Sequence, residues 1–170
     1  GESYRKVRNT LRFMLSNLEG KPDGAGTHAP TSLDAWVLGE YDAMSREVKR
    51  AYEAYDFKTA HARLYDFCNE TLSSVYLAAI KDRMYCDRPD SARRRRTQAA
   101  LHAITDGLCR LLAPVLCHTA DEAYRALLSV DPKNPDVSVH LETFLPEFGV
   151  EADGAWKSAF AVRERALVAL

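Results

Sequence analysis

The stretch LDAWVLGEYDAMSREVKRAYEAY, residues 33–55, decides the fold class of this chain. Its apolar and aromatic residues recur at three- and four-residue steps, which is the period of one face of an α-helix. The stripe comprises Leu33, Trp36, Val37, Tyr41, Met44, Val48, Tyr52 and Tyr55. Thr31 or Ser32 precedes it and can cap the helix. We interpret its aromatic residues, together with Phe57 and Phe67, as core packing rather than as a platform for stacked bases.

Helical patterns flank this stretch on both sides. A first stripe comprises Tyr4, Val7, Leu11, Met14 and Leu18. It predicts a helix that ends at Glu19–Gly20, followed by a Gly/Pro-rich loop. On the other side, Asp56 can cap a third helix, which we expect to continue through the segment IKDRMY until Pro89 breaks it.

Two more helices follow before the pattern changes. Asp90 or Ser91 can cap the first of them, which extends to Pro114. The segment TADE, residues 119–122, has the capping-box pattern and predicts the start of a fifth helix through Leu128. The sequence thus predicts an all-α antiparallel helix bundle over residues 1–129.

Residues 130–170 predict a different arrangement. Turn-forming residues in DPKNPD are followed by VSVHLETFL, whose alternation and β-branched content indicate one extended strand. Trp156, Phe160 and Leu167 then recur at helical spacing, so we expect a C-terminal helix whose partner can lie beyond Leu170. This part is therefore predicted to be a connecting extended segment followed by a helix.

The composition is that of an ordinary globular domain. Of 170 residues, 46% are hydrophobic and 28% are charged, and no apolar run approaches the roughly 20 residues that cross a bilayer. The N-terminus lacks a signal-peptide core, so we expect no membrane and a cytoplasmic location. Because the chain has no initiator methionine and stops within a helical pattern, we expect it to be an excised piece of a larger protein.

The sequence contains no recognised catalytic or metal-binding motif. The four cysteines, Cys68, Cys86, Cys109 and Cys117, are isolated in apolar surroundings, and we expect them to be reduced core residues. His118 and Glu122 are one helical turn apart, but two ligands do not make a metal site. The chain has no phosphate-binding glycine loop, zinc-protease motif or nucleophile elbow.

Basic charge is concentrated in two short segments. Residues 1–12 hold four basic residues against one glutamate, and residues 81–96 hold seven against three aspartates. Since the formal net charge is only -1, the rest of the chain carries -8. Arginines 93–96 would begin a helix, where the macrodipole disfavours cations. Either they bind an anionic partner, or they form solvated ion pairs with the aspartates of the same segment.

Tyr85 lies among these cations and allows two interpretations. Nucleic-acid sites often combine cations for phosphate with an aromatic ring for an unstacked base. A tyrosine that closes the end of the bundle fits equally well.

Several strings together resemble a known family. They are YRKVRNTLRFMLSNLEG, LDAWVLGE, AYEAYDFKTAHARLYDFCNETLSSVYLAAIKDRMYC, DSARRRRTQAALH and RLLAPVLCHTADEAY. In this order, over most of residues 3–127, they resemble the helical anticodon-binding domain of bacterial-type isoleucyl-tRNA synthetases. SVHLETFLPEF resembles the segment that follows this bundle, and the remainder resembles the start of the family's C-terminal region.

The resemblance implies a function and partners. The family joins isoleucine to its tRNA using ATP with magnesium, and its bundle binds the anticodon stem-loop. The HIGH and KMSKS signatures of its catalytic domain are absent here, so we expect no catalytic residue and no cofactor in this chain. Zinc belongs to a C-terminal region that is not represented here. We expect the isoleucine tRNA and the catalytic domain of the same parent chain as partners, and a monomer.

The resemblance also implies the binding residues. Lys81 of IKDRMY is expected to contact the anticodon loop, with Arg83 and Tyr85 beside it. Contacts from the opening helix, to the stem-loop or to the catalytic domain, are expected from Arg8, Asn9 and Arg12. The arginine run holds more basic residues than the family commonly shows, and we assign its first two members, Arg93 and Arg94, to the same surface.

Two alternatives to RNA binding come from other classes of protein. The chain could be a helical protein-interaction or scaffold domain, in which the basic segments dock on an acidic partner or stay solvated. An enzyme in its own right would need a nucleophile, metal or phosphate-loop arrangement, which the sequence lacks.

Overall fold

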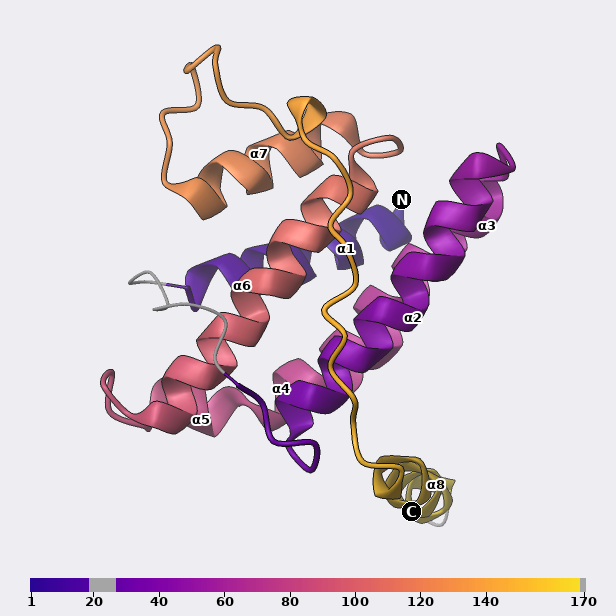
Figure 1. Ribbon diagram of the computed structural model, residues 1–170, viewed down its shortest axis with the longest axis vertical. Coiled ribbons are helices and arrows are strands. Elements are labelled where there is room, and N and C mark those ends of the chain that lie inside the picture. Colours follow the sequence, from indigo (N-terminus) through magenta and orange to yellow (C-terminus); the bar gives the residue numbers. More distant parts are fainter. Residues whose placement is uncertain (19–26, 169–170) are drawn as a thin grey trace.

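The computed structural model describes residues 1–18 and 27–168, and these residues form helices and connecting segments without any β-strand (Figure 1). The elements are α1 (Glu2–Ser16), α2 (Leu33–Glu53), α3 (Phe57–Asp66), the π-helix η1 (Phe67–Tyr76), α4 (Leu77–Ala79), α5 (Lys81–Tyr85), α6 (Ala92–Leu112), α7 (Cys117–Leu128), the 3-10 helix η2 (Val139–Leu141) and α8 (Ala155–Val168). The predicted all-α class is confirmed. The predicted helix end at Glu19–Gly20 and the start of the loop lie outside the described residues, and α1 ends at Ser16.

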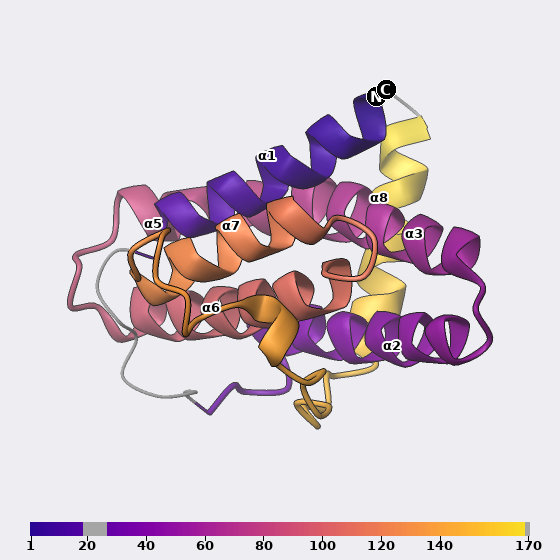
Figure 2. The same cartoon turned by 90° about the horizontal axis from the view of Figure 1, so that it is seen from above.

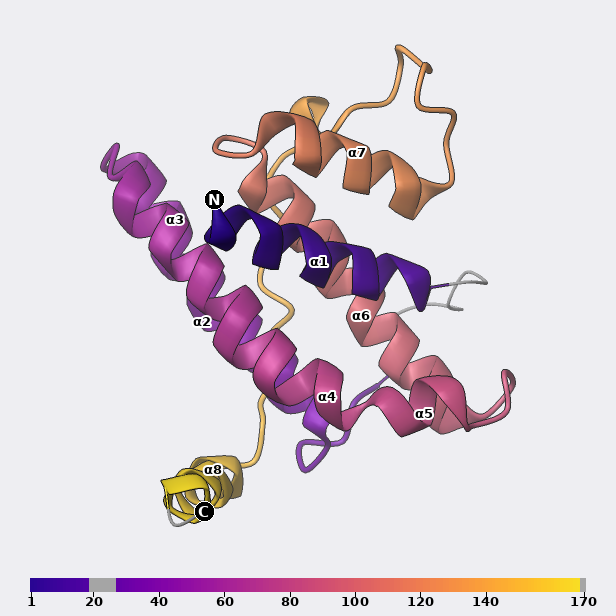
Figure 3. The ribbon, with the colours of Figure 1, turned by 180° about the vertical axis from the view of Figure 1, so that it is seen from behind.

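The longer helices enclose one core. α2 and the α3–η1 segment run antiparallel and pack along their length, with α6 packed against α2. α1 lies across the back of this arrangement (Figure 3), and α7 turns back from α6 to lie alongside α1 (Figure 2). Side chains with almost no exposure fill the space between them, including Leu11, Met14, Tyr41, Leu64, Leu72, Tyr76, Leu101, Ile104, Leu108 and Leu112.

Side-chain caps start the long helices where the sequence predicts them. The hydroxyl of Ser32 accepts a hydrogen bond from the backbone N–H of Ala35, and the Asp56 carboxylate accepts one from Thr59. Ser91 caps α6 in the same way through the N–H of Arg94. Each cap satisfies one of the unpaired amides at a helix start, so the bundle has defined helix boundaries at these three places.

The predicted single helix from Phe57 through IKDRMY is wrong in its second half. The chain stays helical, but from Phe67 to Tyr76 it widens into a π-helix, and α4 ends at Ala79, so that Ile80 separates it from α5. In the wide turn, the hydroxyl of Ser74 donates to the carbonyl of Asn69 at 2.8 Å. Ser73 lies 3.0 Å from Thr10 of α1. The Ser74 hydroxyl thus offers the Asn69 carbonyl an alternative to regular α-helical bonding.

The predicted strand in VSVHLETFL and the predicted capping box are also wrong. Residues 139–141 form a 3-10 turn, because the Asp121 carboxylate accepts hydrogen bonds from the Ser138 hydroxyl at 2.7 Å and from the Val139 N–H at 2.9 Å. In a β-strand, the backbone of a partner strand would have to accept the hydrogen bond that the Val139 N–H donates to Asp121 here. α7 begins at Cys117, and no side chain caps it, because Thr119 and Glu122 contact α1 instead.

After η2, the chain runs in extended form along α2 to α8 (Figure 1). The buried Asp42 of α2 accepts hydrogen bonds from the backbone N–H groups of Phe148 and Gly149, at 2.9 and 3.0 Å. Lys49 donates to the carbonyl oxygen of Leu145 at 2.6 Å. The connecting segment is therefore held by side chains of α2 and not by a neighbouring strand.

The predicted C-terminal helix is present as α8 and finds its partner within the chain. Trp36 of α2 contacts Phe160 with ring centroids 4.5 Å apart, and Trp156 packs on the same pair. Arg163 donates to the carbonyl oxygen of Ser74 in η1 at 3.3 Å. Leu167, the third residue of the predicted stripe, is 56% exposed.

Some residues assigned to the core lie on the surface. Cys68 and Cys109 are buried as expected, but Cys86 and Cys117 are exposed. Tyr55 and Phe57 flank the turn between α2 and α3 and are 82% and 48% exposed, so this part of the core assignment is wrong. A helical stripe does not show where its helix extends beyond its neighbours, and these residues follow the last turn of α2.

Candidate nucleic-acid interface

The short helix α5 presents two different faces. Lys81 and Tyr85 are four residues apart, and this spacing places them on one side of the helix. Both are exposed, Tyr85 by 64% of its surface. No ion pair is formed by Lys81 with any residue that the structure describes. The outer face of α5 therefore offers one unneutralised cation next to an aromatic ring.

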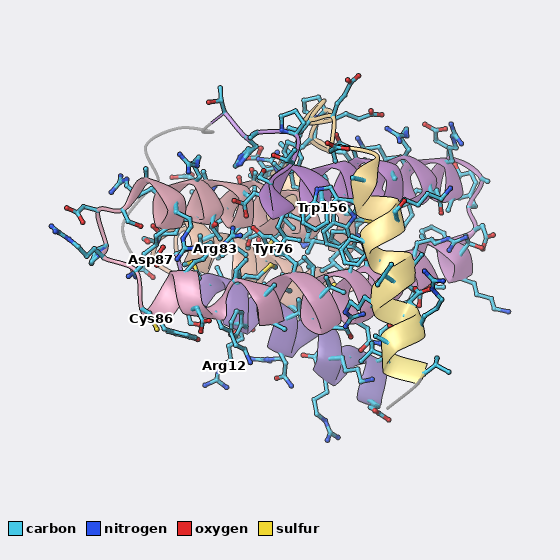
Figure 4. The ribbon with its side chains drawn as sticks, turned by 90° about the horizontal axis from the view of Figure 1, so that it is seen from below. Arg12, Tyr76, Arg83, Cys86, Asp87 and Trp156 are labelled. Carbon is cyan, nitrogen blue, oxygen red and sulfur yellow. The ribbon has the colours of Figure 1, made fainter. Side chains whose placement is uncertain are left out.

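Arg83 points to the opposite side of α5, toward the interior (Figure 4). Its guanidinium lies 3.5 Å from the carboxylate of Asp34 and 3.4 Å from the hydroxyl of Thr97. Only 24% of the Arg83 side chain is exposed, and Asp34 is almost fully buried. The structure thus separates Arg83 from the two neighbours with which the sequence grouped it.

Asp34 is a buried polar centre that sequence reasoning missed. Its carboxylate accepts a hydrogen bond from the Tyr76 hydroxyl at 2.7 Å and another from the Thr97 hydroxyl at 3.1 Å. Burial, together with the neighbouring Asp34 carboxylate, holds the pKa of Tyr76 well above its usual value, so Tyr76 stays a donor. The one available signal was an acidic residue beside Leu33 and Ala35 on the apolar side of the helix start.

Arginines of residues 81–96 form ion pairs with aspartates of the same segment. Arg93 binds Asp87 through two guanidinium nitrogens. The hydrogen bond from Arg93 lowers the pKa of Asp87 against the opposing effect of burial, and the Arg93 charge, a hydrogen bond from Ser91 and the Arg83 charge act in the same direction. Arg94 donates to the backbone carbonyl of Asp87 at 3.0 Å. Arg88 pairs with Asp90 at 3.1 Å. The interpretation of solvated ion pairs therefore describes Arg88 and Arg93, whereas RNA contacts of Arg93 and Arg94 stay a prediction.

The basic residues of α1 lie beside α7. Arg8 is 3.4 Å from the carboxylate of Glu122, and Tyr4 is within hydrogen-bond distance of the Thr119 hydroxyl. Between the two helices is a groove of about 480 Å³, which Arg8 and Arg12 line together with apolar side chains. Asn9 is exposed one position beyond Arg8.

Figure 4 shows which of these residues share a side of the molecule. Arg12 and Cys86, the residue directly after α5, project from the same edge, whereas Arg83 and Tyr76 lie between the helices. The structure thus brings one cation of α1 and the end of α5 to a common edge. Arg8 is turned toward Glu122 of α7.

His28 lies in a separate pocket of about 420 Å³ that Asp34 and Arg96 also line. Burial lowers the pKa of His28 below its usual value. The Asp34 charge opposes this shift of the pKa, and the Arg96 charge adds to it. Among residues 1–18 and 27–168, no group of three or more His, Cys, Asp or Glu side chains is placed to hold a metal ion. The same residues include no helix that is both long and apolar enough to cross a bilayer.

The profile of the family described as the anticodon-binding domain of tRNA ligase matches residues 34–169. The chain belongs to this family of anticodon-binding domains. It begins to match at Asp34, so the match covers α5 and the whole arginine run.

Proteins similar to this chain agree with this family. The chain is 36% identical to an isoleucine–tRNA ligase of Desulfotalea psychrophila over 99% of its own length and 19% of that protein. It is 40% identical to the isoleucine–tRNA ligases of Nitrosococcus oceani and Bordetella pertussis, over 94% and 98% of its length and 17% and 18% of theirs. The anticodon-binding chain thus spans about a fifth of the length of these relatives.

Proposed function

We propose that this chain binds the anticodon stem-loop of isoleucine tRNA as the anticodon-binding part of an isoleucine–tRNA ligase. The observation that carries the proposal is the family match over residues 34–169, together with the isoleucine–tRNA ligases among its relatives. The outer face of α5 supplies suitable chemistry, because an unneutralised cation lies next to an exposed aromatic ring.

The proposed binding residues can make two kinds of RNA contact. Lys81 and Arg12 can bind phosphates, which supply affinity without regard to sequence. Tyr85 can stack on a base that is splayed out of the loop, and Asn9 can hydrogen-bond to sugar or base atoms. Arg8 is available to a phosphate as well, because its exposed pair with Glu122 is worth only about 0–1 kcal/mol.

Attachment of isoleucine is assigned to other parts of such a ligase. ATP with magnesium would act in its catalytic domain and zinc in its C-terminal region, so this chain would hold neither. The catalytic domain of the same polypeptide is the proposed protein partner. We further propose a monomer that works in the cytoplasm.

A protein-interaction role is the second candidate. Its support is that Arg88 and Arg93 are already paired with Asp90 and Asp87, so part of the basic segment is neutralised without RNA. In that case an acidic protein partner would occupy the outer face of α5.

Kinetics of the ligase that contains this chain test the proposal. Lys81→Ala and Tyr85→Ala should each raise the Michaelis constant for isoleucine tRNA about three- to tenfold, while tRNA-independent formation of the aminoacyl-adenylate stays nearly constant. Lys58→Ala is the matched control, because it removes an exposed lysine from the first turn of α3. Unchanged tRNA kinetics in both α5 variants would contradict the proposal.

Direct binding separates the two candidate functions. The chain should bind an isoleucine anticodon stem-loop more tightly than one with a scrambled loop, with an affinity that falls as salt rises. A protein-interaction domain with solvated basic segments would show equal, weak binding to both RNAs.

A further inference from the structure

We propose that Asp34 and Arg83 act as a pair of positioning residues, which hold α5 with its outer face toward the RNA. The inference rests on the proposed function and assigns to Arg83 a role other than direct contact. It also gives a role to Asp34, which no sequence motif indicated.

α5 cannot fix its own orientation. It has five residues, no side chain caps its start, and Met84 is its one buried residue. Helices of this length are not stable alone in water. Ile80 interrupts the preceding helix, so α4 does not impose its direction on α5. Something other than helix propensity must orient α5.

Arg83 holds α5 against the bundle. Arg83 is the polar side chain of α5 that reaches the interior, where its guanidinium meets Asp34 at 3.5 Å and Thr97 at 3.4 Å. Asp34 belongs to α2 and Thr97 to α6, so one side chain ties α5 to two long helices of the bundle.

Asp34, the acceptor, is itself held in place by other donors. The Asp34 carboxylate is also bound by the hydroxyls of Tyr76 and Thr97, at 2.7 and 3.1 Å. A buried carboxylate with several donors has a fixed orientation, and it defines the position of any cation that pairs with it. The hydrogen bonds of Asp34 thus transmit the geometry of η1 and α6 to α5.

The helical geometry of α5 couples the direction of Arg83 to the directions of Lys81 and Tyr85. Arg83 lies two residues from both Lys81 and Tyr85, about 200° around the helix. When Arg83 is bound inward, the other two side chains must therefore face outward. A rotation of α5 that released Arg83 would turn both of them away from their present direction.

Removal of the Asp34 charge should change RNA binding in opposite directions under the two possible roles of Arg83. If Arg83 touched RNA directly, Asp34→Asn would leave RNA binding unchanged or strengthen it, because a nearby negative charge is lost. If the pair positions α5, Asp34→Asn should weaken binding of isoleucine tRNA about three- to tenfold, and Arg83→Gln should weaken it to a similar extent. The double variant should bind isoleucine tRNA no more weakly than about the weaker of the two single variants, because both substitutions act on one interaction.

The measurements are made on the ligase that contains this chain, with isoleucine tRNA as the probe. The Michaelis constant for the tRNA should rise in both variants with a much smaller change in kcat. The preference for the isoleucine anticodon over a scrambled loop should fall, whereas simple loss of charge would weaken both RNAs equally. Arg83→Lys, which keeps the charge, should restore part of the preference.

Two variants make the outcome independent of folding defects. Arg88→Gln is the matched control, since it removes an arginine of the same segment that pairs with Asp90 at the surface. It should leave loop preference as in the wild type. If Asp34→Asn does not fold, Arg83→Gln at its partly exposed site still decides the question through its effect on loop preference.

The outcomes distinguish this inference from the proposed function. If Lys81→Ala raises the Michaelis constant for tRNA but Arg83→Gln behaves like Arg88→Gln, the positioning role is overturned and the RNA-binding function stands. Stronger RNA binding by Asp34→Asn would overturn it as well. If the wild type has no preference for the isoleucine loop, both are overturned.

Discussion

Gly107 of α6 lies directly against the hydroxyl group of Tyr41 in α2. A methyl group added at Gly107 would overlap the Tyr41 ring, and both residues are buried. The close approach of α2 and α6 at this point therefore depends on the missing side chain.

Gly107→Ala should destabilise the fold, although alanine favours helices more than glycine does by about 1 kcal/mol. Overpacking of this kind costs about 1–3 kcal/mol, so we expect a lower free energy of unfolding in urea. Gly39→Ala is the control, because its new methyl group would meet the Val150 carbonyl oxygen at an ordinary 3.6 Å. It should be neutral or stabilising, and equal effects of the two changes would contradict the packing described here.

Trp36→Ala should release α8 from the bundle while leaving the core folded. α8 has no fully buried residue, and its contact with α2 is made largely by Trp36 against Trp156 and Phe160. Limited proteolysis should then cut between residues 150 and 155 much faster than in the wild type. Val162→Ala, at a site 56% exposed, should leave the cleavage rate unchanged.

The four cysteines should divide into two pairs by reactivity. Cys86 and Cys117 are exposed, whereas burial raises the pKa of Cys68 and Cys109 to about 12. Since the thiolate is the reactive form, iodoacetamide at pH 8 should label the first two in the folded protein and all four in urea. Mass spectrometry of the peptides measures this, and early labelling of Cys68 would contradict the described core.

Asp121 should contribute to stability in a pH-dependent way. Burial alone would raise its pKa, but hydrogen bonds from Arg125, Ser138 and the Val139 N–H outweigh burial and lower it. A carboxyl group with a lowered folded pKa stabilises above its unfolded pKa of about 3.9, and this contribution is lost as pH falls through the folded value.

The difference in unfolding free energy between wild type and Asp121→Asn should therefore be largest near pH 7 and shrink below about pH 4. Asp136→Asn, at an exposed site in the connecting segment to which Asp121 is bound, is the control and should show little difference at either pH. A difference for Asp121→Asn that does not change with pH would show that its charge is not involved.

Much of the fold was predictable because its signals are local. The apolar stripes of α1, α2 and α6 and the caps at Ser32, Asp56 and Ser91 depend on residues a few positions apart. The failures involve partners that are distant in sequence. Thr119 contacts α1 and does not form the predicted capping box. The segment after residue 136 bonds to Asp121 and does not form the predicted strand.

The candidate site was predictable only in part for the same reason. The family resemblance indicated Lys81 and Tyr85, and the structure places both on one exposed face. The inward direction of Arg83 depends on Asp34, which is 49 positions earlier in the chain. No periodicity within residues 81–96 carries that information.

The wide turn of η1 has a consequence for protein design. Each residue added to or removed from an ordinary helix rotates everything after it by about 100°, and a π-helical segment changes this phase without a break in the chain. A designer who grafts α5 onto a regular helical scaffold would find Lys81 and Tyr85 aimed in another direction. The graft would have to include residues 67–80, so the smallest transferable unit is much longer than the five residues of α5.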